Sequence, residues 1–234
     1  MHEVFQCPSV DYRTRHLWSL AACLLLVTWC VPLASVDARD DWELWTELRW
    51  KHPVAERLTL QGVSSMRLRG DMGELYRQFE EVGLGYKWLP WLKTEGAYHW
   101  NASDRANTHD NIYEHRLYAG LIPNIVVGRF QIENRNRLEF RHLNGHDDWR
   151  YRNRSKVSLP LGTDRWWQIS PFVADELFYG FRAGEINRNR MVAGVERSLT
   201  KLLAVELFYV LESNKAGRDW DEFHGVGIAT TVTF

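Results

Sequence analysis

Arginine and glutamate recur at every second position in several stretches of this chain, most clearly in the segment NRNRLEFR at 134–141. Side chains two residues apart on a β-strand point to the same face, so these charges would share one surface. Guanidinium groups bind carboxylates and other oxyanions through planar, paired hydrogen bonds. The residues that we single out for this chemistry are Arg135, Arg137, Glu139, Arg141, Arg152, Arg154 and Glu176.

Two kinds of chemistry are open to such a surface. The positive and negative side chains can pair with one another, which would produce a salt-bridged and mostly filled interior. Alternatively, the surface can line a narrow conduit or cleft for a small charged solute. The anion-attracting wall would then consist of Arg135, Arg137, Arg141, Arg152 and Arg154. We expect the paired interior, because charged lumens are ordinary in β-barrels.

Residues that could act as nucleophiles or bases do not form a recognisable pattern. The candidates for a barrel enzyme acting on lipid are His99, His115, His142 and His146, with Ser155, Ser158 and Ser170. No predicted strand carries a serine and a histidine on one face at a suitable spacing, and no phosphate-binding loop or dinucleotide motif is present. His142, His146, Asp147 and Asp148 could bind a metal, but a solvated surface loop is by far the better explanation of these residues. We therefore expect no enzyme, no cofactor and no metal site.

The N-terminus has the layout of a secretory signal peptide. Arg13 and Arg15 precede a nearly uncharged run from Leu17 to Val36, and the sequence Val36-Asp37-Ala38 fits a cleavage site. All three cysteines of the chain lie in this leader. We expect a signal peptide at 1–38 and one domain at 39–234, without disulfides or a thiol nucleophile. An uncleaved membrane anchor is the alternative for the leader.

After the leader, the dominant hydrophobic period is two, which predicts β-strands. With a formal net charge of −1, the chain shows no sign of a nucleic-acid partner. Clusters of turn-forming residues separate eleven runs. These runs lie at about 42–50, 57–69, 74–88, 93–101, 111–121, 125–141, 150–159, 166–179, 187–198, 202–213 and 222–234. We see no helix or linker, so we predict one all-β domain.

The runs have the length and flanking residues of membrane-spanning strands. They are about as long as the roughly nine to eleven residues that a tilted transmembrane strand needs. The chain has 12 Trp, and aromatic residues lie near the ends of nearly every run. Such aromatic girdles mark the two interfaces of outer-membrane barrels. We therefore predict an antiparallel, up-and-down transmembrane β-barrel of about 10–12 strands, in contact with outer-membrane lipid.

The connections and the strand number add two further expectations. Short links such as 122–124 and 199–201 alternate with longer polar ones such as 142–149 and 214–221, as in barrels with short periplasmic turns and long external loops. Single-chain bacterial barrels have an even number of strands. Either the run at 42–50 lies outside a ten-stranded barrel, or a twelfth strand is present.

The chain ends on an aromatic residue after a strict alternation. Val226, Ile228, Thr230, Val232 and Phe234 share one face of the last run. Termini of soluble domains are usually polar and frayed. In Gram-negative outer-membrane barrels, a C-terminal strand of alternating apolar residues ending in Phe is the signal for the barrel-assembly machinery. The residues Val226, Ile228, Val232 and Phe234 resemble this signal, which makes that machinery an expected partner.

Within that class, the sequence resembles the domain-of-unknown-function family 2490. The matching pieces are DWELWTELRW at 41–50, EHRLY at 114–118, NRNRLEFR at 134–141, WRYRNRSKVSL at 149–159, PFVADELFY at 171–179 and NRMVAGVER at 189–197. The resemblance implies a barrel in the outer membrane of a Gram-negative bacterium, and no established activity or catalytic residues. Two alternatives remain open, namely a barrel enzyme acting on lipid or lipopolysaccharide and a soluble, lipocalin-like periplasmic barrel. The sequence does not predict the oligomeric state.

Overall fold

A computed structural model of the chain describes residues 42–104, 111–162 and 169–234, and the predicted signal peptide at 1–38 lies outside them. Within these ranges no helix is long and apolar enough to cross a membrane. The described residues form eleven strands. They are β1 (Trp42–Pro53), β2 (Leu58–Arg69), β3 (Glu74–Leu89), β4 (Leu92–Asp104), β5 (Asn111–Val127), β6 (Phe130–Leu143), β7 (His146–Ser158), β8 (Ile169–Gly180), β9 (Glu185–Ser198), β10 (Leu203–Ala216) and β11 (Asp219–Thr233).

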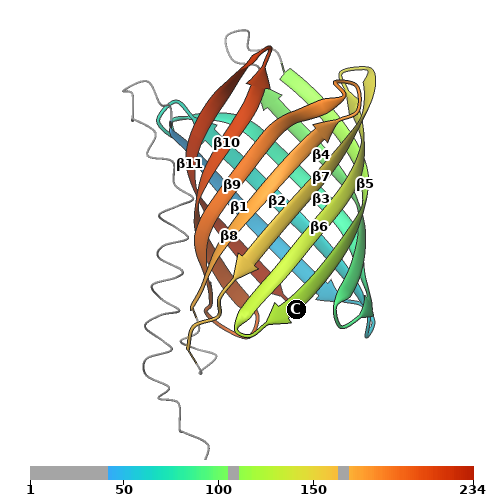
Figure 1. Cartoon of the computed structure of the whole chain (residues 1–234), viewed down its shortest axis with the longest axis vertical. Helices are drawn as coiled ribbons and strands as arrows, with labels where there is room; N and C mark the ends of the chain where they lie inside the picture. The colour runs from blue at the N-terminus through green and yellow to red at the C-terminus, as the bar shows by residue number, and fades with distance from the viewer. Residues whose placement is uncertain (1–41, 105–110, 163–168) are drawn as a thin grey trace, which may run out of the picture. The chain divides into compact units, whose positions relative to one another are not determined.

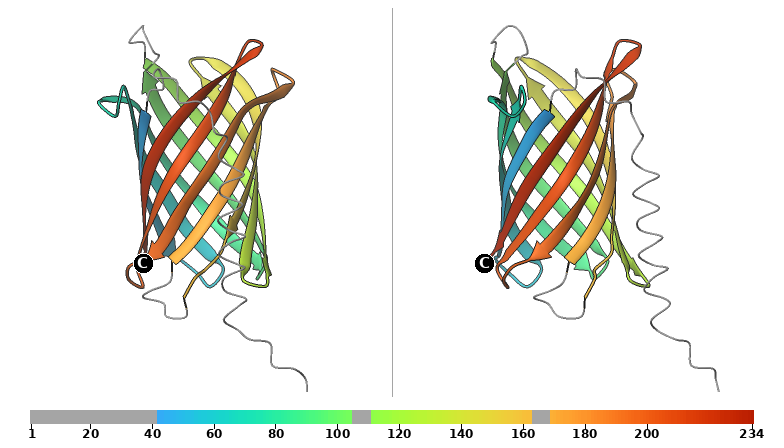
Figure 2. Two further views of the ribbon diagram at one scale, coloured as in Figure 1. Left: turned by 60° about the vertical axis from the view of Figure 1, so that its left-hand side comes forward. Right: turned by 90° about the vertical axis from the view of Figure 1, so that its left-hand side faces the viewer.

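The eleven strands form one closed barrel (Figure 1). Each strand pairs with the next in antiparallel fashion, as the hydrophobic alternation predicts. The barrel closes between β1 and β11, which lie side by side in Figure 2 and run parallel, from Trp42 opposite His224 to Lys51 opposite Thr233. The predicted all-β, up-and-down barrel of about 10–12 strands is therefore confirmed, with one parallel seam.

The expectation of an even strand number was wrong for the described residues. Each run predicted from the sequence corresponds to one strand, and the run at 42–50 is part of the wall as β1. In a barrel with an odd number of strands, an even number of antiparallel steps, here ten, separates the first strand from the last, so the two must run in the same direction. Parallel pairing is only slightly less stable per residue than antiparallel pairing, so the ten register pairs of this seam can close the wall.

The barrel has two rims, which we name after the end of the chain. The C-terminal rim carries the chain end and the connections 54–57, 90–91, 128–129 and 199–202. The distal rim carries the start of β1 and the connections 70–73, 144–145, 181–184 and 217–218. These fully described connections are two or four residues long at both rims, so among them the expected alternation of short and long connections was wrong.

Polar segments expected to be loops are instead paired parts of strands. Residues Ser213–Ala216 of β10 stay in register with Asp219–Glu222 of β11, so this hairpin turns within two residues. The turn between β6 and β7 is equally tight, because Asn144 and Gly145 both adopt positive φ, at 45° and 84°. Two-residue hairpins of this kind need positive φ at both positions and favour Asn-Gly.

The turn expected at 122–124 lies elsewhere. Pro123 belongs to β5, whose pairing with β6 omits residues 122 and 123 and resumes at Asn124. Proline lacks a backbone N–H, so a sheet tolerates it at positions where the neighbouring strand needs no hydrogen bond from that N–H. The chain turns instead at Gly128-Arg129, where Gly128 has a φ of 62°.

The two faces of the wall differ in chemistry. The outward face exposes apolar side chains such as Leu48, Leu117, Leu207 and Ile228. Exposed aromatic residues occur near the distal rim, including Trp42 and Trp149, and near the C-terminal rim, including Trp88. The inward face holds most of the buried charged residues, among them glutamates and arginines from β1 to β10.

The interior has an apolar part and a charged part. Trp45, Phe172, Phe208, Val210 and Ala229 pack together inside β1, β8, β10 and β11. Small residues on β11 make room for these rings, because a Cβ at Gly227 would lie only 2.2 Å from Cζ of Phe208. Charged side chains dominate the inner face of β3 to β7.

Backbone packing at one glycine of β3 yields a stability prediction. A Cβ added at Gly83 would lie 2.3 Å from Cβ of Ala97 and 2.5 Å from the carbonyl oxygen of Gly96. Because backbone atoms cannot move aside cheaply, Gly83→Ala should lower the free energy of unfolding by roughly 1–3 kcal/mol. Urea unfolding followed by tryptophan fluorescence measures this change.

Gly96→Ala on the adjacent strand is the matched control. Its Cβ would meet only the Tyr118 carbonyl oxygen at 3.7 Å, an ordinary contact. We expect Gly96→Ala to leave the stability nearly unchanged. Equal effects of the two substitutions would contradict the described packing at Gly83.

Candidate functional site

The charged lumen is centred on Glu139 of β6, which is fully buried. One carboxylate oxygen, Oε2, lies 2.6 Å from Nη2 of Arg150 and 3.7 Å from Nε of Arg116. The other, Oε1, accepts a hydrogen bond from Nη1 of Arg152 at 2.8 Å. Three guanidinium groups from β5 and β7 thus surround one carboxylate, which offsets the cost of removing it from water.

Ion pairs extend this arrangement around the inner wall. Arg152 also binds Glu176 of β8 at 2.8 Å, and Arg135 and Arg190 lie 3.2 and 3.4 Å from the same carboxylate. On the other side, Arg116 binds Glu114 at 2.9 Å. The ion pairs therefore run without a break from β5 through β9.

Further contacts cross the lumen between strands that are not neighbours in the wall. Arg137 of β6 binds Glu95 of β4 at 2.6 Å and lies 3.8 Å from Glu81 of β3. Lys156 of β7 lies 3.5 Å from Glu206 of β10. These contacts join strands that lie two or three positions apart in the wall and bring their charged side chains together inside the barrel.

An aromatic ring supports the arginines. Phe178 is only 2% exposed. The guanidinium carbons of Arg152 and Arg190 lie 4.7 and 5.2 Å from its ring centroid. Cations over an aromatic face gain electrostatic stabilisation, which grows when water is excluded. Phe178 therefore positions the arginines that bind Glu176 and gives them a partner other than water.

The structure brings most of the predicted lumen residues into this network. Arg135, Arg137, Glu139, Arg152 and Glu176 take part in the contacts above. Arg141 binds Glu114 and lies 3.8 Å from Asp148, near the distal rim. Arg154 lies on the same face opposite Glu176 in register, but no carboxylate of the described residues lies within ion-pair distance of it.

Sequence reasoning missed one principal partner of Glu139. Arg150 was not among the predicted inward residues, although it precedes Arg152 at the same two-residue spacing. Extending that period by one step toward the strand start would have found it. Arg77 was missed as well, although it precedes the inward-facing Glu81 by four residues and so keeps the same alternation.

The histidines considered for catalysis lie apart from one another. His99 is buried in the lumen, with Nδ1 3.2 Å from Glu81. His115 contacts the Tyr98 hydroxyl on the outer face at 2.6 Å. His142 contacts Asp147 at 2.7 Å near the distal rim. In the part of the chain that the structure describes, no group of three or more metal-binding side chains gathers, including around His142, His146, Asp147 and Asp148.

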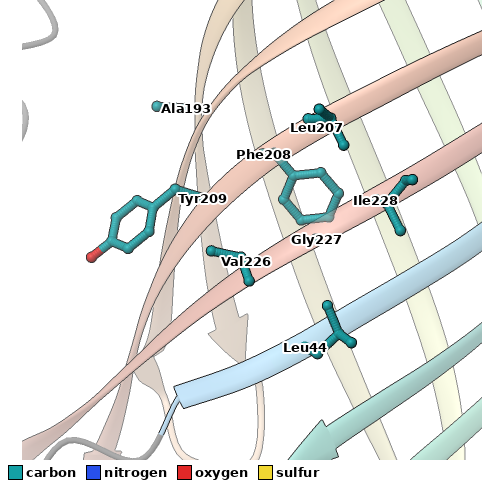
Figure 3. A pocket seen from close by; sticks show the side chains of 8 residues that line it. All are labelled: Leu44, Ala193, Leu207, Phe208, Tyr209, Val226, Gly227 and Ile228. Atoms are coloured by element: carbon teal, nitrogen blue, oxygen red, sulfur yellow. The ribbon is translucent and has the colours of Figure 1, made fainter. Parts of the chain in front are cut away.

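The outer face carries a shallow groove over β9, β10, β11 and β1 (Figure 3). Its lining is almost entirely apolar. The side chains that Figure 3 labels are Leu44, Ala193, Leu207, Phe208, Tyr209, Val226, Gly227 and Ile228. The Tyr209 hydroxyl contacts Nδ1 of His224 at 2.6 Å. The groove therefore offers mainly apolar contact.

The residues of the predicted assembly signal lie on the outer face of β11 and at its end. Ile228 is exposed, and Val226 and Val232 are partly exposed. Phe234 is 67% exposed, with its ring centroid 6.0 Å from that of His52. The Phe234 backbone N–H donates to the Lys51 carbonyl oxygen at 3.0 Å, which fixes the chain end against β1.

The Glu139 network predicts a large and coupled effect on stability. Glu139→Ala should lower the free energy of unfolding by about 3–5 kcal/mol, because it leaves buried guanidinium groups without their carboxylate. The double change Glu139→Ala/Arg150→Ala should cost less than the sum of the two single changes. A double-mutant cycle in urea measures the coupling.

Glu185→Ala is the control for removing a carboxylate from an exposed pair. Glu185 binds Lys215 near the distal rim, and its side chain is 45% exposed. Its loss should cost about 1 kcal/mol or less. Additive effects at Glu139 and Arg150 would indicate solvated, independent side chains and an open lumen.

Comparisons with known proteins identify the family. No curated protein sequence matches the chain. Among solved structures, LpxR from Salmonella typhimurium is similar, with a TM-score of 0.47 and 10% sequence identity over 78% of this chain and 84% of that one. A similarity at this level concerns the chain trace alone. The model of the family DUF2490, described as a protein of unknown function, matches residues 42–222. The resemblance seen in the sequence is confirmed, and the chain belongs to the DUF2490 family.

Proposed function

We propose that this protein is an outer-membrane β-barrel without enzymatic activity, sealed at mid-lumen by its ion pairs, with a structural role. The observation that carries the proposal is the burial of Glu139 between Arg116, Arg150 and Arg152. A carboxylate with no solvent exposure in the middle of the wall is incompatible with a continuous water column beside it. Passage of even a small charged solute would require the network to open.

The outer face supports placement in a membrane. Its exposed leucines, isoleucines and valines lie between aromatic residues at the two rims, which suits a hydrocarbon layer flanked by interfaces. Asn134, Asn136 and Asn153 interrupt this face, but their amides hydrogen-bond to one another at 2.6–3.3 Å. Paired amides cost far less in an apolar layer than unpaired ones.

The seal makes a direct electrical prediction. The purified barrel, reconstituted in a planar lipid bilayer, should show no stepwise conductance in concentrated potassium chloride. An open porin of similar construction serves as the positive control for insertion. Reproducible conductance steps from the wild-type barrel would overturn the sealed lumen.

Membrane placement has its own test, independent of conductance. The protein should stay with the outer-membrane fraction after washing with urea or carbonate. Release into the soluble fraction would favour the lipocalin-like periplasmic barrel instead. A lipid-hydrolysis assay on the same purified protein addresses the enzymatic alternative, since turnover lost on changing His142 alone would contradict the non-enzymatic proposal.

The C-terminal residues fit a role in assembly. Before closure, β11 presents an unpaired edge, and an unpaired edge is a template for another strand. Within the finished barrel that edge is occupied by β1. We infer that the barrel-assembly machinery binds the edge while it is free and recognises Val226, Ile228, Val232 and the terminal ring of Phe234.

Deleting Phe234 should therefore separate folding from assembly. In detergent, the truncated chain should still fold with a loss of about 1–3 kcal/mol, since it lacks one partly exposed ring and one terminal backbone bond. In cells, its insertion should fall sharply, which immunoblotting of membrane fractions measures. Normal insertion of the truncated chain would mean that Phe234 is not part of the signal.

A further inference from the structure

Two arginines near the distal rim differ from the other charges of the lumen. Arg67 of β2 and Arg77 of β3 lie opposite each other in the strand pairing. Directly paired residues have Cβ atoms about 4.5–5.5 Å apart, so two positive charges share one place on the inner wall. Within the described ranges, neither has a carboxylate at ion-pair distance, and the Nε of each is buried without a hydrogen-bond partner.

Their surroundings do not supply the missing negative charge. Glu43 of β1 is buried nearby, but it accepts hydrogen bonds from Nε1 of Trp45 at 2.6 Å and from the Tyr76 hydroxyl at 2.7 Å. Glu212 of β10 binds Arg190 and Arg188. A buried like-charge pair in this setting is costly unless a further anion is present.

The side chain of Arg67 is held in a fixed plane. Only 5% of Arg67 is exposed, and its guanidinium carbon lies 3.4 Å from the centroid of the Trp45 ring. Stacking on an aromatic face covers the flat side of the guanidinium and leaves its N–H donors pointing outward in the plane. This geometry suits paired hydrogen bonds to an oxyanion.

A hydroxyl adds a neutral donor to the same place. Ser65 lies two residues before Arg67 on the inward face of β2 and is 2% exposed. Its Oγ is buried without a hydrogen-bond partner in the described part of the chain. Unsatisfied buried hydroxyls are rare in proteins and call for an explanation. A hydroxyl and two guanidinium groups together are a common donor set for phosphate.

We propose that Ser65, Arg67 and Arg77 form a binding site for a small oxyanion of the phosphate class. Arg67 and Arg77 lie two and three residues from the ends of their strands at the distal rim, so the ligand enters the lumen from that side. The site lies on the inner face of the wall. Its ligand is therefore a free solute and not the headgroup of a membrane lipid.

The test measures the thermal unfolding of the whole barrel in a neutral detergent at constant ionic strength. Inorganic phosphate replaces chloride stepwise, and a parallel series adds phosphatidylglycerol to the micelles. A ligand that binds only the folded state raises the unfolding temperature in a saturable manner. We expect inorganic phosphate to raise the unfolding temperature in this way. Phosphatidylglycerol without phosphate should leave the unfolding temperature unchanged.

Arg77→Gln is the informative variant, because Arg77 is less buried than Arg67 and does not stack on Trp45. Loss of one charged donor should weaken phosphate binding about tenfold or more. Without phosphate, the same change should raise the unfolding temperature above that of wild type, since it removes the repulsion between the two arginines. Arg69→Gln is the matched control. It removes a charge from β2, the strand that pairs with β3, but Arg69 already binds Glu74 at 2.8 Å, so phosphate binding should be retained.

Three results would overturn the site. They are a wild-type response to phosphate no larger than that to chloride, equal phosphate affinity in Arg77→Gln and wild type, and stabilisation by the phospholipid alone. Each of these results concerns only anion binding. The conductance and fractionation experiments test the proposed function of the barrel separately, and their outcome does not depend on the anion site.

Discussion

The interior of this barrel depends on one buried carboxylate. Glu139 has no exposed surface, and it holds guanidinium groups that come from strands on both sides of β6. An eleven-stranded wall encloses more space than its aliphatic side chains fill, and long arginines reach across that space. Without a shared negative centre, those arginines would repel one another in a region of low dielectric. The ion pairs therefore neutralise the arginines and tie neighbouring strands of the wall to one another from inside.

On the apolar side of the interior, aromatic rings occupy the space inside the wall instead of ion-paired side chains. On β9 and β11, Gly194 and Gly227 stand where larger inward residues would clash, and the rings of Phe172 and Phe208 occupy the space that they leave. Trp45 also joins the two parts, since Arg67 and Arg190 lie over its ring. Ring packing and ion pairing thus meet at Trp45 of β1. The seam strand is consequently held by side chains as well as by its parallel backbone pairing.

Much of this architecture could be predicted from the sequence because its signals are local. Alternation with period two marked each strand, and it also assigned Arg135, Arg137, Glu139 and Arg152 to one face. The closure could not be predicted in the same way. The partner of Trp42 is His224, and no local pattern in β1 indicates a parallel neighbour so distant in sequence. Alternation with period two is enough to place Arg67 on the inward face, but it does not show that Arg77 is its partner across the strand pair. That pairing depends on the register of β2 with β3, which shifts between Arg67 and Leu68.

The parallel seam also governs how the barrel can be re-engineered. Because β1 and β11 run in the same direction, Trp42 and Phe234 lie at opposite rims. Twelve residues of a strand tilted by about 40° separate the rims by roughly 30 Å along the axis. A circular permutant would need a linker of that length, and the linker would have to run through a filled lumen or along the apolar outer wall. A barrel with an even strand number needs only a short turn at one rim. In this fold, a design that introduces new chain ends must leave the original ends unjoined. A split barrel that reassembles from two fragments is such a design.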